Sequence, residues 1–398
     1  MTLSKSYCVL PFTAAAVDGQ GNVVPCCRWY PYGITEDTPN IKYGLKNARN
    51  SKFWQTIRQQ MIDGEYPTGC KICWDNESKG GERAKYRMKQ KHIFSDNSPY
   101  GSITTIDNSS TKLRYLETGI SNLCNFACVM CTQVDSSIIH SILRPGEKIP
   151  KGFHKDNENI DDDLSELQVL KLVGGEPMIE KKHDELLEKV ISLNNNPSNL
   201  EIHYHTNVSI FPSERVINCW KKLKEVEIVL SIDGIGDTAT LQRPGNYVWQ
   251  DIEDTVNKYV QLTDEVNIVF SVNVVLTALN IGQITDICDW LYNKVEKNST
   301  MRHATLTPIH KQTHQNYIDF RNLSKETKDR IKEEWKAWEA TNPPVLNTIV
   351  SDLYTVAKDV INEDGLLAEP LTRELILEMH PNAALWKHFK EDLSLLNI

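Results

Sequence analysis

Six short apolar segments after residue 111 most strongly constrain the fold of this chain. They are "KLRYLETGI", "LQVLKLVGG", "LEIHYHTNV", "VEIVLSIDG", "VNIVFSVNVVL" and "MRHATLTPI". Between most of them lie stretches with helical spacing, such as "IEKKHDELLEKVISLN", "PSERVINCWKKL" and "VWQDIEDTVNKYVQL". Buried strands that alternate with helices form parallel sheets, so six such units predict an α/β fold with a partial, TIM-like (β/α)6 barrel. In such barrels the functional residues gather at the C-terminal ends of the strands.

The regions that flank these units have a different character. Residues 1–110 hold five cysteines, many turn residues and little periodicity, which predicts an irregular α+β domain and a linker. Within it, "TAAAVDGQGNVVPCC" predicts a β-hairpin, and "SKFWQTIRQQMIDG" predicts a helix that ends at a glycine. We assign residues 111–321 to the barrel. Residues 322–398 are predicted to form a helical extension, which the pair Pro343-Pro344 interrupts.

Composition excludes several classes of protein. A net charge of −9 argues against a general nucleic-acid binder. The sequence contains no run of 18 apolar residues, so we expect no membrane span. Ten cysteines in 398 residues are too sparse for a secreted disulfide scaffold, so we expect metal binding in a cytoplasmic protein. "YCVLPFTAAAV" is not interpreted as a signal peptide, because Pro11 interrupts it and cleavage would discard Cys8. The basic run 79–91 is typical of a solvated helix face; the alternatives are a grip on an anionic substrate or on nucleic acid.

Three cysteines lie within eight residues in "CNFACVMC", with the spacing C-x3-C-x2-C. They follow the first predicted barrel strand. A structural zinc site and an ordinary iron–sulfur cluster both use four ligands, so three thiolates leave one position open for a substrate or cofactor. The alternative is a zinc site that a distant residue completes.

The segment "SNLCNFACVMC" resembles the signature of the radical S-adenosylmethionine superfamily. The resemblance implies a 4Fe-4S cluster whose open iron chelates the methionine part of S-adenosylmethionine, and "LVGGEPMI" resembles the GGE motif that holds its ammonium group. The implied cluster ligands are Cys124, Cys128 and Cys131, and the implied ammonium cradle is Gly174, Gly175, Glu176 and Pro177.

Further cofactor contacts are implied by the same resemblance. "SIDG", with Ser231 and Asp233, resembles a ribose-contacting segment, and Arg243 in "LQRPGNY" is similar to an arginine that follows it. The remaining candidates are Asn207 and Asn273, as side chains that can face the cofactor, and Val275, as a backbone contact to adenine. His205 and His203 share one face of a strand. His205 is our candidate for proton donation or substrate binding; its alternative is an interior histidine.

A second cysteine set precedes the barrel. The spacing C-x12-G-x4-C that begins at Cys8 resembles the opening of the SPASM and Twitch auxiliary-cluster domains, which usually follow the barrel rather than precede it. The segment "CKIC" adds two further cysteines. Together with it, this resemblance implies a second 4Fe-4S cluster with the ligands Cys8, Cys26, Cys70 and Cys73. Successive side chains on a strand point to opposite faces, so only one of the neighbours Cys26 and Cys27 can readily bind the cluster. The spacing favours Cys26, and Cys27 is the alternative. A four-cysteine zinc ribbon is the alternative for the whole site. Cys219 and Cys288 are predicted to be buried in helices.

The resemblance implies an enzyme that cleaves S-adenosylmethionine reductively and abstracts hydrogen from its substrate through a 5′-deoxyadenosyl radical. An external one-electron donor such as flavodoxin or ferredoxin is implied. The expected substrate is a peptide or protein side chain, which would be oxidised, crosslinked or joined through a thioether. The alternatives are a radical enzyme for a small metabolite or nucleotide and a non-catalytic, redox-sensing iron–sulfur protein.

Overall fold

The computed structural model describes residues 6–29, 33–79, 112–119, 121–148, 164–180, 182–309, 316–367, 370–372 and 374–376. Most of the basic run 79–91 and the linker "SDNSPYGS" lie outside these residues. No helix in the described part of the chain is long and apolar enough to cross a membrane.

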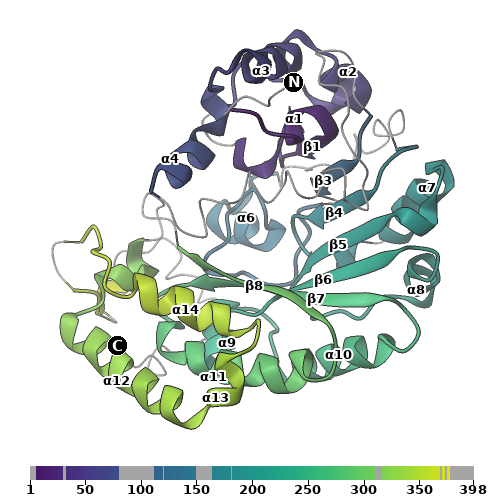
Figure 1. Cartoon of the computed structure of the whole chain (residues 1–398). Helices are drawn as coiled ribbons and strands as arrows, with labels where there is room; N and C mark the ends of the chain where they lie inside the picture. The colour runs from purple at the N-terminus through teal and green to yellow at the C-terminus, as the bar shows by residue number, and fades with distance from the viewer. Residues whose placement is uncertain are drawn as a thin grey trace.

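In the part of the chain that the structure describes, the strands form one mostly parallel sheet (Figure 1). Its eight strands lie in the order β2-β1-β3-β4-β5-β6-β7-β8. The six predicted barrel strands are β3 to β8, each parallel to the next, which confirms the partial barrel. The strand bounds are β1 Ala14–Val17, β2 Val23–Val24, β3 Tyr115–Gly119, β4 Val169–Val173, β5 Glu201–Thr206, β6 Glu225–Ser231, β7 Ile268–Leu276 and β8 Met301–Pro308.

The two faces of the barrel strands carry different side chains. On β4 and β5, for example, Leu170, Leu172, Ile202 and Tyr204 are fully buried in the main hydrophobic core, which also contains the apolar faces of the helices. The alternate positions point to the inside of the barrel. The helices around the outside of the curved sheet are α7 His183–Leu193, α8 Glu214–Trp220, α9 Gly236–Gln242, α10 Trp249–Leu262 and α11 Ile284–Leu291 (Figure 1). Cys219 and Cys288 are buried in α8 and α11, as predicted.

The N-terminal residues pack around a second, smaller core. Their elements are α1 Leu10–Thr13, α2 Leu45–Arg49, α3 Lys52–Asp63, α4 Lys71–Lys79 and the 3-10 turns Cys27–Trp29, Ile41–Tyr43 and Thr68–Cys70. The predicted helix is confirmed as α3, and Gly64 ends it in the left-handed region, with φ 83°. Buried Arg58 donates hydrogen bonds to the carbonyls of Pro11 (2.8 Å) and Arg49 (2.9 Å), and thereby ties α3 to α1 and α2.

The predicted hairpin is also confirmed, with one correction. β1 and β2 pair antiparallel, but β2 ends at Val24, and Cys27 begins a 3-10 turn rather than continuing the strand. Pro25 explains the difference, because proline has no N–H for the ladder and ends strands. β1 also pairs in parallel with β3, so the hairpin extends the sheet of the barrel. The division of the chain into three domains remains a prediction.

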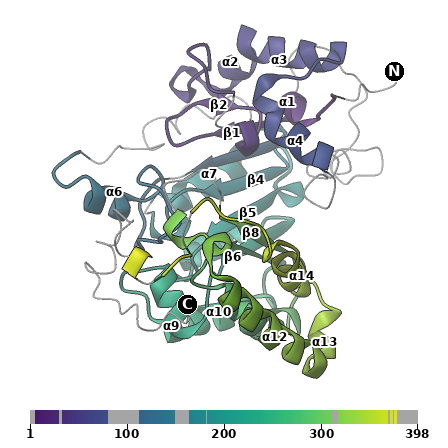
Figure 2. The same cartoon turned by 90° about the vertical axis from the view of Figure 1, so that its left-hand side faces the viewer.

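The C-terminal region is helical, as expected. Its helices are α12 Lys325–Thr341, α13 Pro343–Leu346 and α14 Ser351–Val360, and the break falls at Pro343. α14 contacts β8 and α11. In both views α12 and α13 lie at the opposite end of the molecule from α2 and α3 (Figures 1 and 2). Helix α6 Ser137–Leu143 follows the cysteine loop.

Candidate functional site

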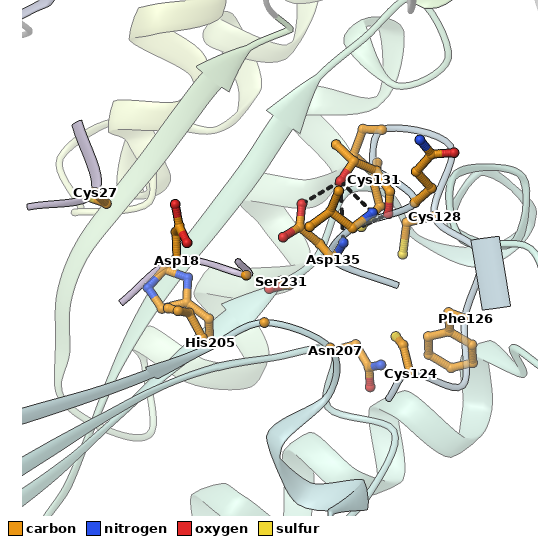
Figure 3. Close-up of a pocket in the computed structure, with 18 of the residues that line it drawn as sticks. Asp18, Cys27, Cys124, Phe126, Cys128, Cys131, Asp135, His205, Asn207 and Ser231 are labelled. Atoms are coloured by element: carbon orange, nitrogen blue, oxygen red, sulfur yellow. Dashed lines mark hydrogen bonds between the residues drawn. The ribbon is translucent and has the colours of Figure 1, made fainter. Parts of the chain in front are cut away.

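A cavity of about 1,040 Å³ opens at the C-terminal ends of the barrel strands. Many of the residues singled out from the sequence line it: Cys124, Cys128, Cys131, Gly174, Gly175, His205, Asn207, Ser231, Asp233, Arg243, Asn273 and Val275. In Figure 3, Cys124 and Cys128 lie on one side of the cavity, and Asp18, Cys27 and His205 lie on the other. The fold therefore gathers residues of the hairpin and of the C-terminal ends of β3 to β7 around one space.

The three clustered cysteines lie on the loop that follows β3. Burial raises the pKa of all three thiols, that of Cys124 to about 12. Cys128 adds to this effect at Cys124 and Cys131, whereas Arg243 opposes it at Cys128. A thiol must lose its proton to bind a metal, so cofactor loading and deprotonation are coupled at this loop. Among the described residues, no three His, Cys, Asp or Glu side chains are arranged to hold a single metal ion. A cubane cluster does not require that arrangement, because each thiolate binds a different iron, and soft thiolates are the donors such clusters prefer.

The Gly-Gly-Glu motif holds the end of β4 against this loop. A Cβ atom at Gly175 would lie 2.1 Å from the backbone oxygen of Leu123, and Gly175 has a positive φ of 31°. Only glycine fits this position without moving the backbone. The backbone N of Glu176 also donates to the oxygen of Leu123, at 2.7 Å. The motif thus sets the distance between the cysteine loop and the sheet.

The side chain of Glu176 is placed differently from the expected cradle. It is 1% exposed and does not line the cavity. Its carboxylate accepts hydrogen bonds from the Thr206 hydroxyl (2.8 Å) and from the backbone N of Asn207 (2.7 Å) and Met178 (3.1 Å). Burial raises its pKa, although these hydrogen bonds act in the opposite direction. The carboxylate therefore joins the ends of β4 and β5. Pro177 does not line the cavity either.

The segment after β6 carries a buried ion pair. Asp233 accepts hydrogen bonds from Arg243 Nη2 (2.5 Å) and from the backbone N of Val275 (2.7 Å). Arg243 Nη1 donates to the sulfur of Cys128 at 3.3 Å. The carbonyl of Val275 accepts from Asn280 at 2.8 Å, so both backbone groups expected to contact adenine already have partners within the protein.

Two asparagines and a serine supply polar atoms to the wall of the cavity. The side chain of Asn207 donates to Asn125 at 2.9 Å and accepts from the backbone N of Ser209 at 3.0 Å. Asn273 accepts from Thr307 at 3.4 Å. Ser231, the last residue of β6, lies in register with Asn273 on β7. These side chains are positioned by strand ends rather than by flexible loops.

The two histidines of β5 have different environments. His203 lies between Glu201 (3.3 Å) and Glu227 (3.1 Å). His205 lines the cavity and has no hydrogen-bond partner among the described residues. Burial, with Lys171, His203 and His303 nearby, lowers the pKa of His205 to about 3. Its imidazole is neutral at physiological pH, so it offers a hydrogen bond rather than the proton of an imidazolium.

A charged layer inside the barrel was not anticipated from the sequence. Glu117, Lys171, His203 and Glu227 occupy one register row across β3 to β6. Lys171 forms an ion pair with Glu117 at 3.5 Å, and Glu117 lines the cavity. Barrel interiors are usually filled by branched apolar side chains. The available signal was the presence of single charged or histidine residues in the middle of strands that are otherwise apolar.

The second cysteine set lines a separate, small cavity. Cys8, Cys26, Cys70 and Cys73 all border it, together with Trp29. Burial raises the pKa of the Cys26 thiol, and Cys27, Cys8, Cys70 and Cys73 add to this effect. Cys27 instead lines the large cavity, beside the hairpin turn Asp18-Gly19-Gln20. Sequence reasoning did not assign this turn to the cavity, because its only local signal was that of a tight turn.

Comparisons with known proteins found a similarity in the central part of the chain. Residues 119–291 match the family described as Radical SAM superfamily. No curated protein matches the chain.

Several solved structures resemble the chain distantly. Streptococcus suis SuiB bound to S-adenosylmethionine is 14% identical, with a TM-score of 0.34 over 56% of this chain and 44% of that one. A histidine-tagged form of anSMEcpe with bound AdoMet is 17% identical, with a TM-score of 0.35 over 48% of this chain and 49% of that one. Native anSMEcpe with bound AdoMet and Cp18Cys peptide is 13% identical, with a TM-score of 0.34 over 51% of this chain and 56% of that one. The chain thus spans about half the length of these proteins.

Proposed function

We propose that this protein is a radical S-adenosylmethionine enzyme. The observation that carries the proposal is the placement of Cys124, Cys128 and Cys131 on one loop in the wall of a large cavity at the C-terminal ends of the strands, within the matched domain. When bound, a reduced 4Fe-4S cluster and S-adenosylmethionine supply a 5′-deoxyadenosyl radical that abstracts hydrogen from a substrate.

The surrounding residues would bind and orient the cofactor. Gly175 lets the end of β4 pack closely against the loop, because a Cβ there would lie 2.1 Å from the Leu123 oxygen, and Gly174 and Gly175 both line the cavity. The Ser231 hydroxyl can both donate and accept a hydrogen bond, and it faces the same cavity. Buried apolar residues such as Phe126 keep one wall dry, which protects a reactive intermediate from water.

We also propose a second 4Fe-4S cluster at the small cavity. Cys8, Cys26, Cys70 and Cys73 are the four thiol ligands that a closed cluster needs. Trp29 borders the same cavity, and its indole N–H is buried without an acceptor in the described part of the chain.

The proposed substrate is a peptide or protein side chain. The cavity volume of about 1,040 Å³ is at the upper limit of usual ligand cavities, which supports a cofactor together with a second ligand. A small metabolite or nucleotide is the second candidate. We propose an external one-electron donor of the flavodoxin or ferredoxin kind and a cytoplasmic setting, where thiols stay reduced.

Cofactor cleavage tests the proposed chemistry. Anaerobically reconstituted protein with dithionite should convert S-adenosylmethionine to 5′-deoxyadenosine and methionine, and the triple variant Cys124→Ala/Cys128→Ala/Cys131→Ala should not. Cys219→Ala is the matched control, because this cysteine is buried in α8 and borders neither cavity. Cleavage by the triple variant at the wild-type rate would refute the assignment, and a protein without any cleavage would favour the redox-sensing alternative.

A further inference from the structure

Arg243 is a buried cation held against one of the three clustered thiols. Its side chain is 8% exposed. One terminal nitrogen donates to the sulfur of Cys128 at 3.3 Å, and the other donates to Asp233 at 2.5 Å. The second oxygen of Asp233 accepts from the backbone N of Val275. The guanidinium is therefore anchored to the ends of β6 and β7 and cannot swing away to water.

The backbone on both sides of Cys128 holds the sulfur in front of this cation. Residues 126–129 run antiparallel beside residues 242–245, with a bridge between Phe126 and Gly245. The flanking hydrogen bonds run from Ala127 N to Pro244 O at 2.8 Å and from Val129 N to Gln242 O at 2.9 Å. Gly245 allows this close approach, because a Cβ there would lie 3.1 Å from the Asn125 oxygen and its φ is +143°. The contact between Arg243 and Cys128 is thus part of the framework.

We propose that Arg243 sets the reduction potential of the cluster bound by Cys124, Cys128 and Cys131, and that it acts through the sulfur of Cys128. The inference rests on the proposed function of this loop. Reduction adds one electron to the cluster, so a fixed positive charge and an N–H···S hydrogen bond stabilise the reduced form more than the oxidised form. Because the site is buried, this charge is screened less than it would be at the surface. Arg243 is therefore a positioning residue that makes the cluster easier to reduce.

The ion pair with Asp233 gives the proposal a second, opposite consequence. The carboxylate partly neutralises the guanidinium and so weakens its effect on the cluster. Removing the Asp233 charge should make the cluster easier to reduce, and removing the Arg243 charge should make it harder. A purely structural ion pair would produce neither shift.

The test is a redox titration of the reconstituted protein, followed by electron paramagnetic resonance without S-adenosylmethionine. The signal that changes when S-adenosylmethionine is added in a parallel sample identifies the cluster of the triad. In Arg243→Met, the ratio of reduced to oxidised cluster at a fixed solution potential should fall about ten-fold. This corresponds to a midpoint potential lower by about 59 mV for a one-electron couple. Arg243→Lys should shift in the same direction but less, because lysine keeps the charge and loses the planar pair of donors. Asp233→Asn should shift in the opposite direction.

Two controls separate a specific effect from a general one. Arg144→Met removes the same charge from the wall of the same cavity, but Arg144 is half exposed and bonds to Gln133 and Glu147, so its shift should be much smaller. The signal that does not respond to S-adenosylmethionine should keep its potential in every variant.

Unchanged potentials in fully loaded Arg243→Met would overturn the inference. If that variant does not take up iron, Arg243→Lys and Asp233→Asn provide the test. Shifts of the reduction potential in opposite directions would support the inference, and unchanged potentials in both variants would refute it. Failure of the proposed function looks different, because then neither signal would respond to S-adenosylmethionine in the wild-type protein.

Discussion

At the scale of single residues, the strand ends bring several side chains to one cavity, and hydrogen bonds within the protein hold others away from it. Cys124, Gly174 and Ser231 line the cavity as their positions after strands indicated, because the C-terminal ends of parallel strands meet at one edge. Glu176 and the backbone groups of Val275 are instead bonded within the protein. A motif places a residue near a strand end, but the direction of its side chain depends on partners that are distant in sequence.

Glu176→Gln is therefore expected to act first on stability. The amide would replace one carboxylate oxygen by NH2, so at least one of the donors Thr206, Asn207 and Met178 would lose its acceptor. We expect a loss of about 1–3 kcal/mol, measured by urea unfolding.

Glu180→Gln is the matched control for this change. Glu180 is only partly buried, and it accepts a longer bond of 3.3 Å from the backbone N of Lys182. Unchanged stability of Glu176→Gln together with a ten-fold weaker affinity for S-adenosylmethionine would show that the carboxylate reaches the cofactor, as the sequence motif implied.

At the scale of elements, the barrel strands were predictable because buried parallel strands are continuous apolar segments with helices between them. The pairing of β1 with β3 was not predictable, because a pairing between strands about 100 residues apart leaves no local pattern in the sequence. The end of the hairpin was also missed: Pro25 stops β2 before Cys26 and Cys27, yet the two neighbouring cysteines still border different cavities.

This arrangement predicts different results for the two cysteines. Wild-type protein should contain about eight iron atoms, as two cubane clusters require. Cys26→Ser should lose about half of them, because Cys26 borders the small cavity with three other thiols, while Cys27→Ser should keep nearly all. Iron and sulfide analysis after anaerobic reconstitution measures both. Loss of iron from Cys27→Ser alone would exchange the two assignments, and one bound zinc in the wild type would restore the zinc-ribbon alternative.

At the scale of the whole molecule, the buried histidines make the fold sensitive to acid. His183 is 3% exposed, and its Nε2 lies 2.8 Å from the Tyr204 hydroxyl. Burial lowers the pKa of His183 from 6.5 to about 4, and Asp184 opposes this only in part. The unfolded chain therefore binds more protons than the folded one between about pH 6.5 and 4, so stability falls as the pH drops through this window.

We expect His183 alone to remove about 2 kcal/mol of stability between pH 7 and pH 5. Urea unfolding of the wild type and of His183→Gln at both pH values measures this contribution, because the difference between the two proteins cancels the effects of all other groups. An equal loss in both proteins would mean that His183 is already able to take up a proton in the folded state.

The parallel pairing of β1 with β3 has a consequence for the order in which the molecule is made. Ala14 lies beside Tyr115, so the first strand must wait for about 100 further residues before its partner leaves the ribosome. Closing a loop of that length costs about 4 kcal/mol of chain entropy, apart from a constant. Cys8, Cys26, Cys70 and Cys73 are all synthesised before this closure, and Cys124 only after β3. Nascent chains would thus present the complete four-thiol set to the machinery of cluster assembly before the three-thiol loop exists.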